Sequence, residues 1–317
     1  MTLVRNKFFI LYSISCILFT SNVAFAQMFD AEGNLPSIEL NMEVYESLKK
    51  SESSDKQDPK TLPLLAADNA KNTSQTEQPF KPSGFIESGV NASTLNNNYG
   101  SWVGEYVKSE INTAPDSRWN LQLLNQREFG EYGQYAVIGN TYNFNEDWYS
   151  VVSVGGASHG FFLPRYRIDA FLNHKLLDDK SLVATLGFGT SKAIIDAHKD
   201  NSIFVGATYY FPQLWILQGG IRFNQSNPGN VLSASEFIAV TEGEDKKHFI
   251  TLRYGFGREA YQIIGQSNTI SNFSSNQISL ELRQWLSDNW GFDARGEYYH
   301  NPNYDRRGIN IGAFYEF

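Results

Sequence analysis

Charged side chains that alternate with apolar ones are the residues of this chain with the clearest chemical potential. In the segment YRIDAFLNHK, Arg167 and Asp169 share one parity, whereas Ile168 and Ala170 share the other. Successive side chains of a β-strand point to opposite faces, so each such segment has one polar and one apolar face. We expect ten charged side chains to face the interior of a barrel: Arg167, Asp169, Lys175, Arg222, Arg253, Glu281, Arg283, Asp293, Arg295 and Glu297.

Two roles for these charged residues remain open at this point. Both signs occur in the neighbouring segments 277–286 and 290–299, so the charges can pair in an interior network that fills the barrel. Alternatively, they line a constricted polar passage that binds or passes a sugar or a small anion. Five aromatic residues share the inward parity and could stack on sugar rings: Phe171, Phe204, Tyr210, Trp285 and Tyr299.

No pattern in the sequence indicates a metal site or a catalytic centre. The five histidines lie singly, there is no HExxH, and the one cysteine is Cys16. The stretch GFGTSK lacks the full spacing of a phosphate-binding loop. We therefore expect no metal, no cofactor and no enzymatic activity. A barrel enzyme that modifies lipids through a Ser and His pair is kept as an alternative.

Composition divides the chain into three parts. Arg5 and Lys7 precede an apolar run, and Ala24-Phe25-Ala26 forms a cleavage site, so residues 1–26 are predicted to be a signal peptide. Residues 27–83 are polar and almost free of aromatics, which predicts a largely disordered periplasmic segment. Residues 84–317 alternate in polarity throughout. The formal net charge of -8 argues against a nucleic-acid partner.

The alternating segments predict fourteen strands, with twelve as the competing count. Short connections (NED, LDDK, PQ, SDN) take turns with longer ones such as AYQIIGQSNTISNFSS, as in bacterial outer-membrane barrels. We therefore predict an all-β, transmembrane, antiparallel up-and-down barrel in the outer membrane of a Gram-negative bacterium. An even strand number places both termini on the periplasmic side. Six tryptophans near strand ends are expected to form interfacial girdles: Trp102, Trp119, Trp148, Trp215, Trp285 and Trp290.

The last residues form a strand with one apolar face. Ile309, Ile311, Tyr315 and Phe317 belong to the same row, which we expect to face hydrocarbon. GAFYEF also resembles the terminal recognition signal of outer-membrane proteins. That resemblance implies that the barrel-insertion machinery reads Gly312, Tyr315 and Phe317.

The central part of the chain resembles the YaiO family of outer-membrane β-barrel proteins. The resemblance rests on Trp148-Tyr149, on the run Phe162 to Arg167, on GATYYF and on the closing RRGINIGAFYEF, and it covers roughly residues 85–317. It implies a barrel embedded in outer-membrane lipid and lipopolysaccharide, and it carries no catalytic motif.

Three functions follow, in order of preference. The first is a passage or accessory for surface polysaccharide or small solutes. The second is a structural or adhesive barrel whose long loops, especially 259–275, bind partners or phage. The third is the lipid-modifying enzyme.

Overall fold

The computed structural model describes residues 80–194, 198–265 and 268–317. The predicted signal peptide and most of the predicted polar segment, residues 27–79, lie outside these ranges. No helix among the described residues is long and apolar enough to cross a membrane.

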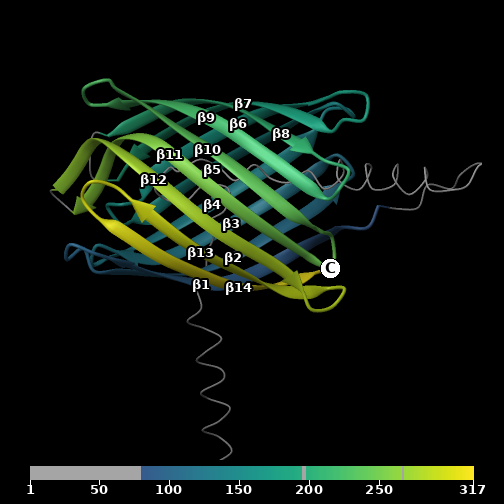
Figure 1. Cartoon of the computed structure of the whole chain (residues 1–317), viewed down its shortest axis with the longest axis horizontal. Coiled ribbons are helices and arrows are strands. Elements are labelled where there is room, and N and C mark those ends of the chain that lie inside the picture. Colours follow the sequence, from purple (N-terminus) through teal and green to yellow (C-terminus); the bar gives the residue numbers. More distant parts are fainter. Residues whose placement is uncertain (1–79, 195–197, 266–267) are drawn as a thin grey trace, which may run out of the picture.

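Fourteen antiparallel strands form one closed barrel, in which each strand pairs with its neighbours in sequence (Figure 1). The strands are β1 (Ser83–Leu95), β2 (Ser101–Ala114), β3 (Ser117–Glu128), β4 (Glu131–Asn143), β5 (Trp148–His159), β6 (Pro164–Leu176), β7 (Leu182–Ala193), β8 (Lys199–Tyr210), β9 (Trp215–Asn227), β10 (Val231–Glu244), β11 (His248–Gly265), β12 (Asn268–Trp285), β13 (Trp290–His300) and β14 (Asp305–Glu316). The predicted fold class and the count of fourteen are confirmed.

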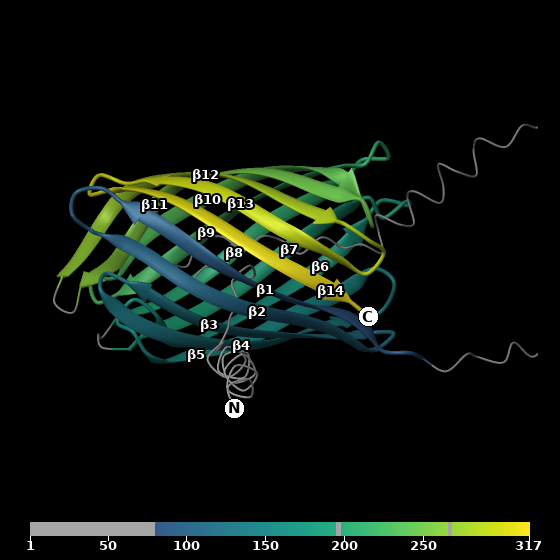
Figure 2. The same cartoon turned by 90° about the horizontal axis from the view of Figure 1, so that it is seen from below.

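Pairing between the first and last strands closes the barrel, as the two views in Figures 1 and 2 show. Glu87 is opposite Phe314 and Gly89 is opposite Gly312. The amide of Phe317 donates to the carbonyl of Gly84 at 2.9 Å, so the last residue is held by backbone hydrogen bonds. Closure leaves no unpaired sheet edge, which a barrel within lipid requires.

The barrel has two ends, which we name by the position of the C-terminus. The terminal end holds Phe317 and the connections 115–116, 144–147, 177–181, 211–214, 245–247 and 286–289. The distal end holds the connections 96–100, 129–130, 160–163, 228–230 and 301–304, together with the ends of β7 and β11 and the starts of β8 and β12. In the turn 177–181 at the terminal end, the Ser181 hydroxyl and amide hydrogen-bond to Asp179 and hold the pKa of that carboxyl below its usual value.

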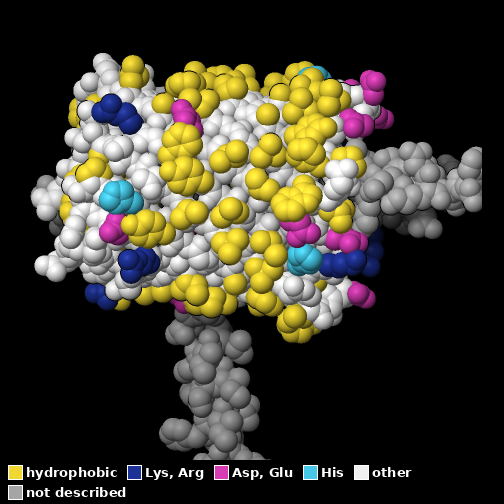
Figure 3. All heavy atoms as spheres, in the orientation of Figure 1, with side chains coloured by type: hydrophobic (Ala, Val, Ile, Leu, Met, Phe, Trp, Pro, Cys, Tyr) yellow, Lys and Arg dark blue, Asp and Glu magenta, His cyan; other side chains and the backbone are white. Residues whose placement is uncertain are grey.

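The outer wall is apolar along the middle of the barrel (Figure 3). The row predicted at the C-terminus lies there, with Ile309, Ile311, Tyr315 and Phe317 each about half exposed. Aromatic side chains flank this band at both ends; Trp119, Trp148, Trp215 and Trp290 do so at the terminal end. The arrangement is that of a membrane-facing wall.

Two of the six tryptophans expected in the girdles lie inside the barrel instead. Trp102 is 5% and Trp285 is 7% exposed, and both occupy inward register positions. Trp285 packs against Phe249 and Phe314. A tryptophan near a strand end therefore does not reveal its face; the parity of its strand does, because Trp285 lies two residues from the inward Arg283.

The predicted difference in loop length between the two ends is wrong. Connections at both ends have two to five residues, because the strands continue into regions expected to be loops. The stretch 259–275 forms the paired extension of β11 and β12, with Glu259 opposite Phe273 and Tyr261 opposite Ser271. The alternation in these extensions is weak because one of their faces meets no hydrocarbon.

Candidate functional site in the barrel interior

All ten charged residues predicted to face inward occupy inward register positions. On each strand they alternate with exposed apolar residues, as Asp169 does with Ile168 on β6 and Arg253 with Leu252 on β11. The structure distributes them over several groups: one along β6–β9, one across the β1–β14 junction, and one between β12 and β14. Lys175 lies apart, nearer the terminal end, with its Nζ 5.8 Å from the ring of Tyr149.

The first group joins β6, β8 and β9. Arg167 Nε donates to Asp169 Oδ2 at 2.7 Å, and Asp169 Oδ1 lies 3.9 Å from Arg222 Nη1. The same Nη1 donates to Ser202 Oγ at 3.1 Å. Arg167, Asp169 and Arg222 are all less than 9% exposed. Two guanidinium groups therefore lie within 4 Å of this one carboxylate.

An aromatic row lies beside this group. The rings of Phe171, Phe204 and Phe237 follow one another across β6, β8 and β10, with centroids 5.9 and 6.4 Å apart. Glycines of the intervening strands make room for them: a Cβ on Gly187 or Gly220 would lie 2.4 Å from a ring atom of Phe171 or Phe204. The rings of Phe171 and Phe204 therefore cover these glycines, with their planes 78° apart.

Arg253 continues this row on β11. Its guanidinium carbon lies 3.8 Å from the ring centroid of Phe237, in cation–π geometry. The ring of Phe237 thus helps to place a second interior cation beside the Arg167, Asp169 and Arg222 group.

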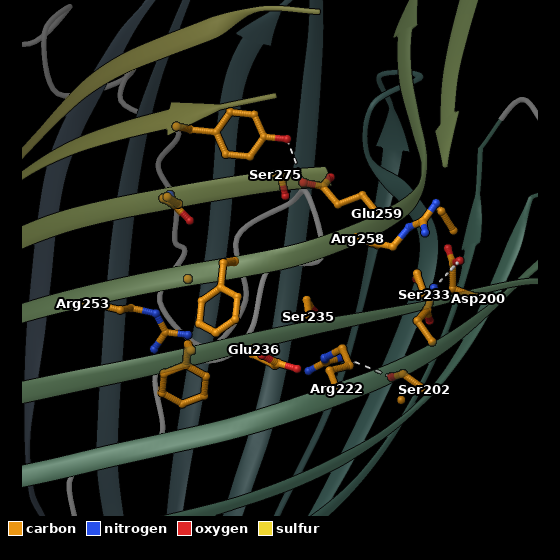
Figure 4. Close-up of a pocket in the computed structure, with 18 of the residues that line it drawn as sticks. Asp200, Ser202, Arg222, Ser233, Ser235, Glu236, Arg253, Arg258, Glu259 and Ser275 are labelled. Atoms are coloured by element: carbon orange, nitrogen blue, oxygen red, sulfur yellow. Dashed lines mark hydrogen bonds between the residues drawn. The ribbon is translucent and has the colours of Figure 1, made fainter. Parts of the chain in front are cut away.

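A cavity of about 200 Å³ lies between β6 and β13. Figure 4 shows Arg222 and Arg253 on its wall, together with Ser202, Ser233 and Ser235. Six of the ten predicted residues line it: Arg167, Asp169, Arg222, Arg253, Glu281 and Arg295. Two further acids on this wall are engaged by neighbours: Asp200 accepts from Asn224 Nδ2 at 3.0 Å, and Glu259 from the Tyr299 hydroxyl at 2.7 Å.

The second group crosses the junction between the first and last strands. Arg283 Nη1 donates to Glu87 Oε2 at 2.9 Å and lies 3.1 Å from Asp293 Oδ2. Lys108 Nζ lies 3.0 Å from the other Glu87 oxygen, and the side chain of Glu87 is fully buried. The Arg283 guanidinium also stacks on Phe314 at 3.6 Å. Side chains from β1, β2, β12 and β13 are thereby tied together.

The third group centres on Glu297. Its carboxylate lies 3.1 Å from both Arg295 Nη2 and Arg306 Nη2, and it accepts from Gln277 Nε2 at 3.1 Å. Arg306 in turn lies over the ring of Trp102 at 4.7 Å. A smaller cavity of about 120 Å³ adjoins this group.

Three interior residues of these groups were not among the predicted site residues. Glu87, Lys108 and Arg306 share inward parity with Phe85, Tyr106 and Asn310, respectively. Glu87 was missed because the alternation of the first strand is weak. Arg306 was missed because β14 begins at Asp305, four residues before Ile309, the first residue of its apolar row.

The aromatic residues expected to stack on sugars are mostly unavailable. Phe204 and Tyr210 are 1% exposed and Trp285 is 7% exposed, since they pack against neighbouring side chains. Of the five, only Tyr299 lines the larger cavity. Three aromatic residues that were not predicted also line this cavity: Phe237, Phe256 and Tyr261.

Connections at the distal end contribute further aromatic side chains on one side of the barrel. Phe129 packs edge-on against Trp102 at 5.0 Å and stacks with Phe161 at 6.2 Å. Phe161 and Leu163, in the connection between β5 and β6, are almost fully buried. This apolar cluster lies over β2–β5, whereas the polar cavity lies along β6–β13.

The residues expected to form the assembly signal fall on both faces of β14. Tyr315 and Phe317 point outward, and Gly312 points inward. A Cβ on Gly312 would lie 2.4 Å from the hydroxyl of Tyr106, so this position admits only glycine without rearrangement. Within the described ranges, no three His, Cys, Asp or Glu side chains are grouped so that they could hold a metal ion.

A closed antiparallel barrel with an apolar outer wall and a charged interior is a membrane β-barrel. The YaiO membrane beta barrel domain matches residues 84–262, and the chain belongs to this family of outer-membrane proteins. No curated protein matches the chain in sequence.

Several solved structures share the barrel architecture. An outer membrane channel from Pseudomonas putida F1 is 6% identical, with a TM-score of 0.48 over 78% of this chain and 100% of the other. An anion-selective porin from Comamonas acidovorans is 10% identical, with a TM-score of 0.43 over 75% and 99%. No statement about solutes follows from these similarities.

Proposed function

We propose that this barrel is a narrow polar passage of the outer membrane for small hydrophilic solutes or surface polysaccharide. The observation that carries the proposal is the cavity between β6 and β13, whose wall holds Arg222 and Arg253 beside hydroxyl and amide groups. A cavity of about 200 Å³ is smaller than the ~300–1,000 Å³ of pockets that hold drug-sized ligands. It suits a small anion or one sugar unit at a time.

We assign the preference for anions to two arginines rather than to the net charge of the wall, because five basic and five acidic residues line the cavity. Asp169 lies within 4 Å of two guanidinium groups, and Asp200 and Glu259 accept hydrogen bonds from their neighbours. Arg222 donates to Ser202 and Arg253 lies over the ring of Phe237, which places both guanidinium groups along the cavity wall. In this proposal no residue performs a catalytic step, and no cofactor is required.

We further propose how the barrel is oriented in the outer membrane and which of its residues the insertion machinery reads. The even strand number brings both ends of the barrel sequence to the terminal end, which we place in the periplasm. The insertion machinery would then read Gly312, Tyr315 and Phe317 on β14 from that side. Outer-membrane phospholipid and lipopolysaccharide would surround the apolar band.

Planar lipid bilayers test the passage directly. The full chain should give reproducible conductance with a reversal potential that favours anions, and Arg222→Ala and Arg253→Ala should each shift this potential toward cations. Arg307→Ala removes an exposed arginine from the outer wall and should change neither quantity. A bilayer that stays closed after verified insertion would refute the proposal. A neutral oligosaccharide that blocks the current would favour the polysaccharide arm over free passage of ions.

A further inference from the structure

The outer wall of β7 and β8 changes in character toward the distal end. Phe188 and Ile203 form an outward cross-strand pair and are 57% and 46% exposed. Thr190 lies two residues nearer the distal end than Phe188 and is opposite Asn201. The side chains of Thr190 and Asn201 hydrogen-bond at 3.1 Å. The wall thus passes from apolar to neutral polar within one pair of residues.

The next outward pair consists of two lysines. Lys192 on β7 is directly opposite Lys199 on β8, and the register is regular up to this pair. Across the described part of the chain, neither ammonium group has a carboxylate partner. Asp200, next to Lys199 in sequence, points inward, where Ser226 and Asn224 bind it, and Asp196 of the connection lies outside the described residues. Like charges directly opposite on a sheet are destabilising, so a bound anion would relieve the repulsion between the two lysines.

A third cation lies beside the pair. Arg165 is exposed, and its Nη2 donates to the carbonyl of Ile194 at 2.7 Å, two residues beyond Lys192. On the other side of Lys192, the outward neighbour on β6 is Tyr166. Among the residues that the structure describes, the side chains named beside the lysines are therefore cationic or neutral.

The depth of the lysines in the membrane follows from strand geometry. Lys192 is four residues beyond Phe188, or about 13 Å along the strand at ~3.3 Å per residue. With a strand tilt of roughly 40°, this is about 10 Å of height above the apolar row. The headgroup layers add about 5–8 Å on each side of the hydrocarbon core. Both ammonium groups therefore lie at or just beyond the level of lipid headgroups.

The terminal end of the barrel, unlike the distal end, is rich in acidic side chains. On the face shown in Figure 3, acidic side chains gather mostly at the terminal end and basic ones mostly at the distal end. The connections of the terminal end carry several acids: Asp116, Glu146, Asp147, Asp178, Asp179, Asp245 and Asp288. Lys180 there pairs with Glu146 at 2.8 Å, so its charge is neutralised within the chain.

We propose that Lys192 and Lys199, flanked by Arg165, bind the phosphate groups of a phosphorylated glycolipid of the outer leaflet, that is, the lipid A part of lipopolysaccharide. Two ammonium groups on one wall match a headgroup that carries more than one negative charge. A zwitterionic phospholipid fits less well because it brings its own ammonium group. The site requires the distal end to face outward, and it does not depend on any passage through the lumen.

The test measures lipid A binding to the full chain refolded in detergent. The probe is diphosphoryl lipid A, compared with lipid A from which phosphate has been removed enzymatically. Loss of two cations near an anionic headgroup should weaken binding roughly 30-fold in Lys192→Gln/Lys199→Gln. Lys192→Arg/Lys199→Arg should retain binding. Lys246→Gln/Lys247→Gln, which makes the same charge change at the terminal end, should bind like the parent chain.

Each outcome decides for or against the site. Two results together support the site. Only Lys192→Gln/Lys199→Gln should bind lipid A more weakly than the parent chain, and the parent chain should bind dephosphorylated lipid A equally weakly. Equal binding by the glutamine variant and the parent overturns it, provided that both migrate as heat-modifiable barrels on gels. Competition by inorganic phosphate at the concentration of the lipid also overturns it, because the site would then recognise free phosphate rather than the glycolipid.

Discussion

Removing the guanidinium of Arg283 should destabilise the barrel where its first and last strands meet. Arg283→Met keeps most of the apolar stem, which lies against Phe314, but removes the hydrogen bonds to Glu87 and Asp293. Glu87 keeps Lys108 as a partner at 3.0 Å, whereas Asp293 has no other basic residue that forms an ion pair with it among the described residues.

The expected loss can be worked out from these contacts. Breaking a buried ion pair by removal of one partner costs about 3–5 kcal/mol, because the remaining charge stays buried. Lys108 still neutralises Glu87, and the side chain of Arg283 is 19% exposed, so the lower limit applies. We expect the free energy of unfolding to fall by about 3 kcal/mol.

Guanidinium titration of the barrel in phospholipid vesicles measures this quantity. Arg307→Met serves as the matched control, because Arg307 is exposed on the outer wall of β14 and should cost about 0.5 kcal/mol or less. The double variant Arg283→Met/Asp293→Asn removes the stranded carboxylate as well and should recover part of the loss.

A loss below about 1 kcal/mol in Arg283→Met would refute this reasoning, since the buried carboxylates would then not need the guanidinium. The same conclusion would follow if the double variant Arg283→Met/Asp293→Asn were no more stable than Arg283→Met.

Two further predictions concern the wall and the C-terminus. Leu280 is 55% exposed on the outer wall, whereas Ser279 lines the cavity. Leu280→Lys should therefore lower the free energy of unfolding by about 2–4 kcal/mol, and Ser279→Lys by less than half as much. Equal losses in the same titration would mean that the two faces are misassigned. If Phe317 is part of the assembly signal, Phe317→Ala should reduce the amount of the heat-modifiable form in outer-membrane fractions, while Phe317→Tyr should preserve it. Unchanged amounts in both variants would exclude Phe317 from the assembly signal.

The strands of the membrane-spanning part were predictable because two different media act on their two faces. Residues 166–176 and 290–299 alternate between oily and charged side chains, and the structure gives both strands the expected parity. Where the two faces of a strand do not differ in polarity, the sequence does not show the alternation that predicts a strand. Glu236 lies on the outward parity of β10 between Ile221 and Phe256, and it interrupted the alternation of a strand that nevertheless pairs along its whole length.

The partners of the interior charges could not be read from the sequence. Asp169 was expected inside, but its shared position between Arg167 and Arg222 depends on the stagger of β6 relative to β9. Glu87 and Arg283 are 196 residues apart, and only closure of the barrel brings them together. The parity of a residue along its strand indicates whether its side chain faces inward or outward. The stagger between strands and the closure of the barrel determine which side chains it meets there.

The Glu87 and Arg283 contact also imposes an order on biogenesis. These residues come from the opening and the closing segments of the barrel sequence, with β13 and β14 lying between them in the wall. Until the final hairpin is in place, the carboxylate near the start of the barrel has no guanidinium from β12 within reach. In a nascent or truncated chain that ends before β14, Lys108 of the neighbouring strand can pair with this carboxylate, but the contact that joins the two ends of the barrel sequence is still missing.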